Sequence, residues 1–187
     1  MHQLSEIAKR LFFAIGMVAS IILLGRAVGF GSPWLGLIAS FCVLGILDLA
    51  MPFIRLRLPQ ALREVRAWEL RGGVYRTLGV PVFGRVLRRS PLRLLNRKVY
   101  LRGFARDLTA VRLRLEETEA AHFWGGLVTL PYLGFAWTQA WWSNLTCVML
   151  FDVVVNIYPI FHLRAMRGRI EQALLRGRSL YARKQTA

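Results

Sequence analysis

Residues 123–163 read FWGGLVTLPYLGFAWTQAWWSNLTCVMLFDVVVNIYPIFHL and contain a single Asp, Glu, Lys or Arg, Asp152. A short polar tip at 143–144 separates two apolar segments, 123–142 and 145–163. A helix of about 20 apolar residues is long enough to cross the hydrocarbon core of a bilayer. The stretch therefore predicts a hairpin of two membrane-spanning helices.

A second apolar pair lies near the beginning of the sequence. Residues 11–28 and 34–54 are each nearly uncharged, and the segment Gly29-Phe30-Gly31-Ser32-Pro33 between them has the composition of a turn. We expect an all-α integral membrane protein that forms a single domain over residues 1–187. Its four spans would form two hairpins, joined by a basic, amphipathic-helical segment at 55–121 and followed by a basic tail at 164–187.

The distribution of charge predicts the orientation of these spans. The chain of 187 residues has 26 Lys and Arg against 10 Asp and Glu, and all but one of the basic residues lie before 11, within 55–121 or after 163. Because loops rich in Lys and Arg stay in the cytoplasm, both termini and the central segment should face the cytoplasm of a bacterial cell. We expect anionic lipids of the inner membrane, rather than nucleic acid, to be the partner of these charges.

The central segment should contain two amphipathic helices. Residues 58–69 predict a helix on the membrane surface that ends at Gly72-Gly73, and the glycines and prolines of 75–95 indicate irregular structure. Further on, Leu101, Phe104, Leu108, Val111 and Leu115 recur at alternating spacings of three and four, as on one face of a helix. Continuing that face reaches Glu119 and His122, which should point inward.

Glu119 and His122 are a candidate catalytic pair. Residues at i and i+3 are neighbours on a helix surface, so the carboxylate can orient the imidazole and raise its basicity. A histidine held in this way is a plausible general base. The alternative is that both residues are polar only because they lie at the membrane interface.

Two further groups of polar residues stand out around the last span. Asp152 and Asn156 lie one turn apart, and an acidic residue halfway through a span should face the protein interior. Arg164, Arg167 and Arg169 follow directly after the span and could bind phosphate, although a basic cluster is expected there in any case. Asp152 and Asn156 could equally form a hydrogen bond between helices that has no catalytic role.

Several motifs of other enzyme classes are missing from the sequence. It contains no GxSxG, P-loop, HExxH or GxGxxG motif, and no histidine is followed by the His-x4-Asp pattern of glycerolipid acyltransferases. No Ser or Cys accompanies a candidate base, which disfavours a covalent enzyme intermediate. We expect neither a metal nor a tightly bound cofactor.

Two motifs resemble those of the glycosyl-4,4'-diaponeurosporenoate acyltransferases. These motifs are Glu119-Ala-Ala-His122-Phe-Trp124 before a span, and Asn156 with Arg164-Ala-Met-Arg167-Gly-Arg169 after the next. Glu69, Gly72 and Tyr75 form a looser upstream match, so the resemblance covers about residues 69–170. It departs from the family pattern at Phe123, which separates His122 from Trp124, at Pro159, which lies one place late, and at Leu163, where Gln is usual.

The resemblance implies an O-acyltransferase that works at the inner leaflet on a lipid-soluble, carotenoid-like glycoside. His122 with Glu119 would be catalytic, and Arg164, Arg167 and Arg169 would bind the phosphates of a donor such as acyl-CoA. Asn156, Asp152, Glu69 and Tyr75 would complete the substrate site. Two alternatives remain open: a membrane protein that binds lipid or pigment without turnover, and an accessory subunit that docks a partner through its basic face.

Overall fold

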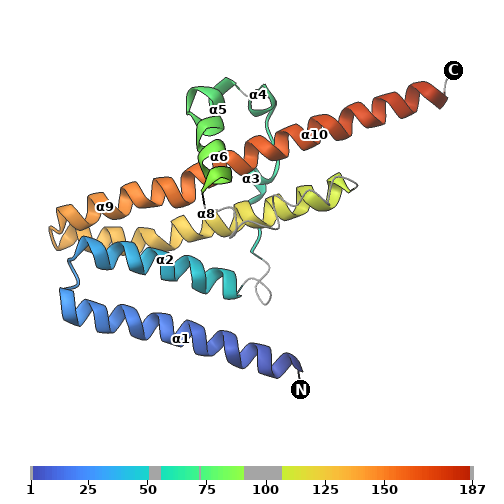
Figure 1. Cartoon of the computed structure of the whole chain (residues 1–187). Coiled ribbons are helices and arrows are strands. Elements are labelled where there is room, and N and C mark those ends of the chain that lie inside the picture. Colours follow the sequence, from blue (N-terminus) through green and yellow to red (C-terminus); the bar gives the residue numbers. More distant parts are fainter. Residues whose placement is uncertain (1, 51–55, 72, 91–106, 186–187) are drawn as a thin grey trace. The chain divides into compact units, whose positions relative to one another are not determined.

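The computed structural model describes residues 2–50, 56–71, 73–90 and 107–185, and these residues form helices without strands. The all-α prediction is therefore confirmed for this part of the chain. Contacts divide the chain into two compact units (Figure 1). Unit 1 comprises residues 1–56 and 121–157, and unit 2 comprises residues 57–120 and 158–187. The assignment of the whole chain to one domain stays a prediction.

Unit 1 is built from apolar helices that run back and forth. Helix α1 (His2–Val28) packs against α2 (Pro33–Ala50), and α2 packs against α9 (Trp142–Asp152). The predicted turn between the first two helices is present: Gly29 has φ +86°, and the Ser32 amide donates to its carbonyl over 3.1 Å. A positive φ is accessible to glycine without strain, so Gly29 ends α1.

One asparagine links three segments at the turn end of unit 1. The Asn144 side chain is fully buried, donates through Nδ2 to the Ser32 carbonyl over 2.8 Å, and accepts at Oδ1 from the Tyr132 hydroxyl over 3.0 Å. A Cβ at Gly36 would lie 2.5 Å from Val148 Cγ2. The absence of a side chain at Gly36 thus allows α2 to approach α9 closely.

The described residues of unit 2 include four short helices, three of which pack on one long helix. These are α3 (Gln60–Arg63), α4 (Ala67–Leu70), α5 (Gly73–Thr77) and α6 (Val80–Arg89), and α4, α5 and α6 contact α10 (Tyr158–Gln185). The sequence interpretation was wrong at two places here. The helix predicted over 58–69 is two separate turns, and the segment predicted to be irregular contains α5 and α6.

Two helices pass from one unit into the other. Helix α8 (Leu108–Thr138) joins the predicted amphipathic helix to the predicted third span, and the fourth predicted span runs through α9, the π-helix η3 (Val153–Ile157) and α10. The inward face is confirmed at Leu115 and Glu119, which are buried. Leu101 and Phe104, which begin the predicted stripe, lie outside the described residues, as do residues 51–55 of the second predicted span.

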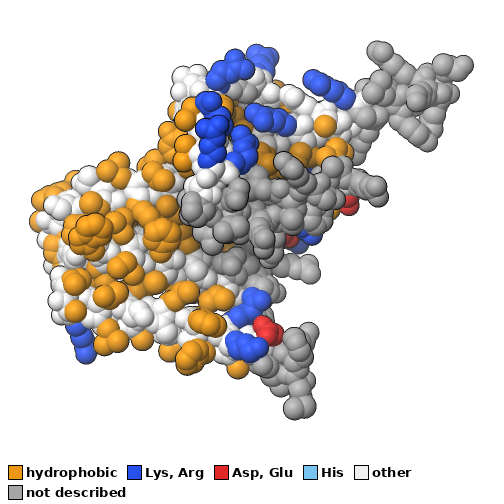
Figure 2. Space-filling view, viewed as in Figure 1, with side chains coloured by type: hydrophobic (Ala, Val, Ile, Leu, Met, Phe, Trp, Pro, Cys, Tyr) orange, Lys and Arg blue, Asp and Glu red, His pale blue; other side chains and the backbone are white. Residues whose placement is uncertain are grey.

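Among the described residues, two helical stretches are long and apolar enough to cross a membrane, Glu6–Val28 and Trp142–Arg176, while Pro33–Leu47 is a shorter apolar helix. Only 6% of the apolar window in the first stretch is buried. Hydrophobic side chains are spread over the face of unit 1 that Figure 2 shows. The prediction of four spans is thus supported at two of them and stays a prediction at the other two.

Candidate functional site

A buried ion-pair cluster forms the centre of unit 2. Arg164 binds Glu69 with two parallel contacts, Nε to Oε1 at 2.6 Å and Nη2 to Oε2 at 2.9 Å. Its Nη1 also donates to Glu119 Oε1 over 2.8 Å, and Arg167 Nη1 donates to Glu119 Oε2 over 2.6 Å. All four side chains are buried, so two guanidinium groups compensate two carboxylates in a water-poor environment.

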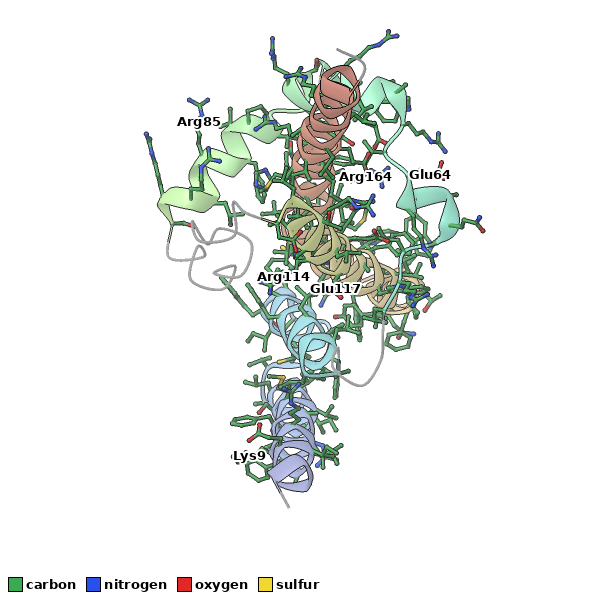
Figure 3. All side chains as sticks on the ribbon, turned by 90° about the vertical axis from the view of Figure 1, so that its right-hand side faces the viewer. Lys9, Glu64, Arg85, Arg114, Glu117 and Arg164 are labelled. Carbon is green, nitrogen blue, oxygen red and sulfur yellow. The ribbon has the colours of Figure 1, made fainter. Side chains whose placement is uncertain are left out.

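The same two arginines explain why the helix predicted over 58–69 is interrupted. Arg164 donates to the carbonyls of Leu62 and Glu64, and Arg167 donates to the carbonyl of Arg63. A continuous helix would need these carbonyls for its own i to i+4 hydrogen bonds. Glu64 and Arg66 instead have extended backbones between α3 and α4. Figure 3 shows Arg164 beside the segment that carries Glu64.

The Glu69 carboxylate accepts hydrogen bonds from three residues. Besides Arg164, it accepts from the Tyr75 hydroxyl over 2.6 Å and from the Arg66 amide over 2.7 Å. Burial alone would raise the pKa of Glu69, but these hydrogen bonds outweigh it and lower that pKa to about 2. Burial and the neighbouring carboxylate raise the pKa of Tyr75, so its hydroxyl stays protonated and donates.

A second polar cluster lies within unit 1, around His122. The Nδ1 atom of this half-buried histidine on α8 lies 3.4 Å from Asn156 Oδ1 on η3. Asn156 Nδ2 donates to Asp152 Oδ1 over 2.7 Å, which fixes the amide so that its oxygen faces the histidine. An amide oxygen accepts only from a protonated nitrogen, so this contact favours the tautomer with hydrogen on Nδ1 and a lone pair on Nε2.

Asp152 has a second donor within its hydrogen-bonding distance. Thr129 Oγ1 lies 3.3 Å from Asp152 Oδ1 and 2.7 Å from the Gly126 carbonyl. A hydroxyl has one proton, so Thr129 donates to one of these oxygens at a time. The cluster is therefore a chain of contacts from Thr129 through Asp152 and Asn156 to the imidazole.

The π-helix and Gly125 bring this chain together. Pro159 has no N–H for the Val155 carbonyl, its i−4 partner in a regular α-helix, and the chain forms the π-helix η3 directly before it. A Cβ at Gly125 would lie 3.1 Å from Asn156 Oδ1 and 2.6 Å from a Leu44 methyl. The missing side chain thus lets η3 approach α8.

His122 lies one residue before the third predicted span, where burial lowers its pKa, although its contacts with Asn156 and Val155 oppose that effect. A lowered pKa keeps the imidazole neutral at neutral pH. Neutral imidazole with a free lone pair is the form that can accept a proton from a hydroxyl.

The predicted site residues therefore fall into two groups with different partners. Glu69, Tyr75, Glu119, Arg164 and Arg167 form the cluster of unit 2. His122, Asp152 and Asn156 form the cluster of unit 1. The predicted carboxylate partner of His122, Glu119, uses both of its oxygens for arginines, and Asn156 occupies the place at Nδ1 instead. The proximity of His122 to the arginines stays a prediction.

Arg169 lines a separate feature, a cavity of about 520 Å³ within unit 2. Helices α4, α5, α6 and α10 contribute its walls. Four other arginines that sequence reasoning did not single out also line it, along with His162 and Gln172; these arginines are Arg71, Arg76, Arg85 and Arg88. A Cβ at Gly84 of α6 would lie 2.6 Å from His162 Cε1, so this glycine lets α6 pack directly on the ring.

A local signal for this cavity was present in the sequence. Gly79 has φ +71° and caps α6, and Pro81 lies in the first turn of that helix. Both are signals for the start of a helix rather than for irregular structure. Recognition of α6 would have placed Arg85 and Arg88, at i and i+3, on one face.

The match to known families covers most of these residues. The glycosyl-4,4'-diaponeurosporenoate acyltransferase family matches residues 59–176, more than half of the chain. That range includes both clusters and the cavity. No curated protein and no solved structure matches the chain. The resemblance seen in the two motifs is thus confirmed, and the chain belongs to the glycosyl-4,4'-diaponeurosporenoate acyltransferase family, a family of acyltransferases.

Proposed function

We propose that the protein is a membrane-embedded O-acyltransferase in which His122 is the general base. The observation that supports this role is the chain of contacts from Asp152 through Asn156 to His122 Nδ1. It favours a lone pair on Nε2, and burial keeps the ring neutral.

The proposed reaction is a direct transfer between two bound substrates. His122 Nε2 takes the proton of an acceptor hydroxyl as that oxygen attacks the carbonyl carbon of an acyl thioester. The new ester C–O bond forms and the C–S bond breaks, and the imidazolium returns the proton to the departing thiolate. General-base catalysis of this kind contributes about 10²- to 10⁴-fold to a rate.

The proposed acceptor is a hydroxyl of a lipid-soluble, carotenoid-like glycoside, in line with the name of the family. An acceptor of this kind and the acyl chain both dissolve in a bilayer. The exposed apolar surface of α1, with large residues such as Phe12 and Phe13 mostly exposed, fits a lipid environment. We propose a multi-pass protein of the bacterial inner membrane with both termini in the cytoplasm, because nearly all Lys and Arg lie on that side of the predicted spans.

The decisive experiment compares lipid and pigment extracts of cells that express the wild-type protein, the His122→Gln variant or neither. Gln retains an N–H that can donate to Asn156 but has no basic nitrogen. Wild-type cells should accumulate a product heavier by one fatty acyl group, and the variant should form at least about 100-fold less at equal protein level in the membrane. Equal product from both proteins would refute the role of His122. A co-purifying pigment without any added acyl mass would instead indicate a binding protein.

A further inference from the structure

The cavity of unit 2 has an excess of positive charge at its rim. Its five arginines, Arg71, Arg76, Arg85, Arg88 and Arg169, are all exposed. The one acidic residue among its lining residues, Glu69, is already paired with Arg164. Figure 2 shows Lys and Arg side chains gathered over α5 and α6, and Figure 3 shows Arg85 extending away from the α6 ribbon.

None of these five guanidinium groups has a hydrogen bond or an ion pair with another residue in the described part of the chain. Arg164 and Arg167 differ from them, since their donors are directed at carboxylates and carbonyls. Five cations held around one hollow repel one another unless an anion lies between them. The unused donors of the rim are thus available to a ligand with several negative charges.

The floor and the size of the cavity restrict the ligand further. A volume of about 520 Å³ is within the range that holds one small molecule. Apolar wall residues such as Leu70, Val80 and Met166 suit a flat heterocycle, and Gln172 adds a polar side chain. A single phosphate of a lipid headgroup would leave most of the arginines unpaired, whereas a nucleotide with several phosphates would engage them.

We propose that this cavity binds the phosphate-bearing nucleotide half of a coenzyme A thioester, the acyl donor. The proposal rests on the proposed acyltransferase function, whose chemistry requires an activated acyl group. Of the three arginines that the sequence predicts to bind phosphate, the proposal keeps Arg169 and replaces Arg164 and Arg167 by Arg88 and the other arginines of the rim. Guanidinium groups suit this role because their paired N–H donors match phosphate oxygens.

The direct test is the binding of free coenzyme A, without an acyl chain, to the purified full-length protein in neutral detergent. Arg88→Gln removes a cavity-lining charge from α6. Arg89→Gln is the matched control, because Arg89 is the adjacent residue of the same helix, is also exposed and does not line the cavity. We expect Arg88→Gln to weaken binding about 10- to 100-fold and Arg89→Gln to change it less than about threefold.

Competing ligands distinguish the sources of phosphate. Adenosine 3',5'-bisphosphate should displace coenzyme A, and pantetheine, which lacks phosphate, should not. Binding of phosphatidylglycerol nanodiscs that depends on Arg88, without binding of coenzyme A, would overturn the proposal in favour of a lipid headgroup site. Equal weakening by Arg88→Gln and Arg89→Gln, or no binding of either ligand, would also overturn it.

The same measurements separate this proposal from the role of His122. The His122→Gln variant should bind coenzyme A like the wild type, although it should form at least about 100-fold less product. Normal coenzyme A binding in a protein that never acylates a hydroxyl would leave the cavity assignment standing and refute the proposed function. If the wild-type protein bound no coenzyme A but transfer were lost in His122→Gln, the cavity assignment would be refuted and the role of His122 would stand.

Discussion

The two polar clusters differ in how completely their hydrogen-bonding groups are used. In unit 2, the nitrogens of Arg164 donate to two carboxylates and two carbonyls, and Glu119 accepts at both oxygens. In unit 1, the described contacts of His122 and Asn156 leave the favoured lone pair on Nε2 available. A cluster in which each carboxylate is paired with an arginine stabilises a fold, although Arg167 Nε is buried there without a partner. A cluster with an unused basic atom can act on a substrate. The two motifs of the sequence each contribute to both clusters.

The largest expected effect comes from breaking the ion-pair cluster of unit 2. Arg164→Ala would leave Glu69 and Glu119 buried with one arginine fewer, at a cost of about 3–5 kcal/mol in unfolding free energy. Arg164→Lys should recover only part of this stability, because lysine cannot form the two-contact pair with Glu69. Thermal unfolding followed by circular dichroism in detergent measures both.

Arg89→Ala is the control for this variant, since Arg89 is an exposed arginine of the same unit. It should change stability by less than about 0.5 kcal/mol. If Arg164→Ala unfolded at the same temperature as Arg89→Ala, the cluster would not be a stabilising element.

Replacing Asn156, the partner of His122, should affect the rate of acyl transfer more than the stability of the fold. Asn156→Ala deletes the acceptor at Nδ1 and should lower the transfer rate about 10- to 100-fold. Because the Asn156 contact raises the pKa of His122, its loss should also shift the acid limb of the pH–rate profile, where protonation of His122 lowers the rate, to lower pH. An unshifted profile with a lower rate would indicate a packing role only.

A smaller effect should follow from acidification of unit 2. Glu69 has a pKa of about 2 in the folded protein against an ordinary value of 4.5, so its stabilising contribution is complete above about pH 4.5 and is lost as the pH falls toward 2. The difference in melting temperature between the wild type and Glu69→Gln should therefore shrink over that range. Glu117→Gln is the control, because Glu117 is an exposed residue of α8, and it should change the melting temperature only slightly at neutral pH. If the difference between the wild type and Glu69→Gln stayed constant as the pH fell, the ion-pair role of Glu69 would be contradicted.

The smallest effect is expected at the end of the histidine chain. Thr129→Val keeps the shape of the side chain but removes the hydroxyl that Asp152 shares with the Gly126 carbonyl. The transfer rate should fall about threefold or less, since Asn156 remains as the donor to Asp152. If Thr129→Val lowered the transfer rate as much as Asn156→Ala does, Thr129 would have a more direct role in the reaction than its contacts indicate.

The spacing of apolar residues predicted correctly which side chains share one face of a helix. It did not predict which residues from distant parts of the chain bind those side chains. The spacing of three and four brought Glu119 inward correctly, because side-chain direction is a local property of a helix. The choice of Arg164 and Arg167 as its partners spans 45 and 48 residues and depends on tertiary packing. The interruption of the helix predicted over 58–69 has the same origin, since α10 supplies the donors to its carbonyls.

The glycines of unit 2 were harder to interpret than the apolar runs. Gly79 and Gly84 predict a break in regular structure, yet Gly79 caps α6 and Gly84 lies inside it against His162. Only the neighbouring ring shows why a glycine is needed at position 84. The cavity of unit 2 therefore could not be predicted from the spacing of residues alone.

The central claim is that the imidazole of His122 supplies the base for acyl transfer, and chemical rescue tests it most directly. The measurement is the transfer rate of purified His122→Gly in detergent, with and without imidazole in the buffer, beside the wild type under both conditions. The account predicts a rate at least about 100-fold below wild type that rises with the concentration of neutral imidazole, and a wild-type rate that does not respond. A His122→Gly protein that transfers the acyl group at the wild-type rate without imidazole would contradict it.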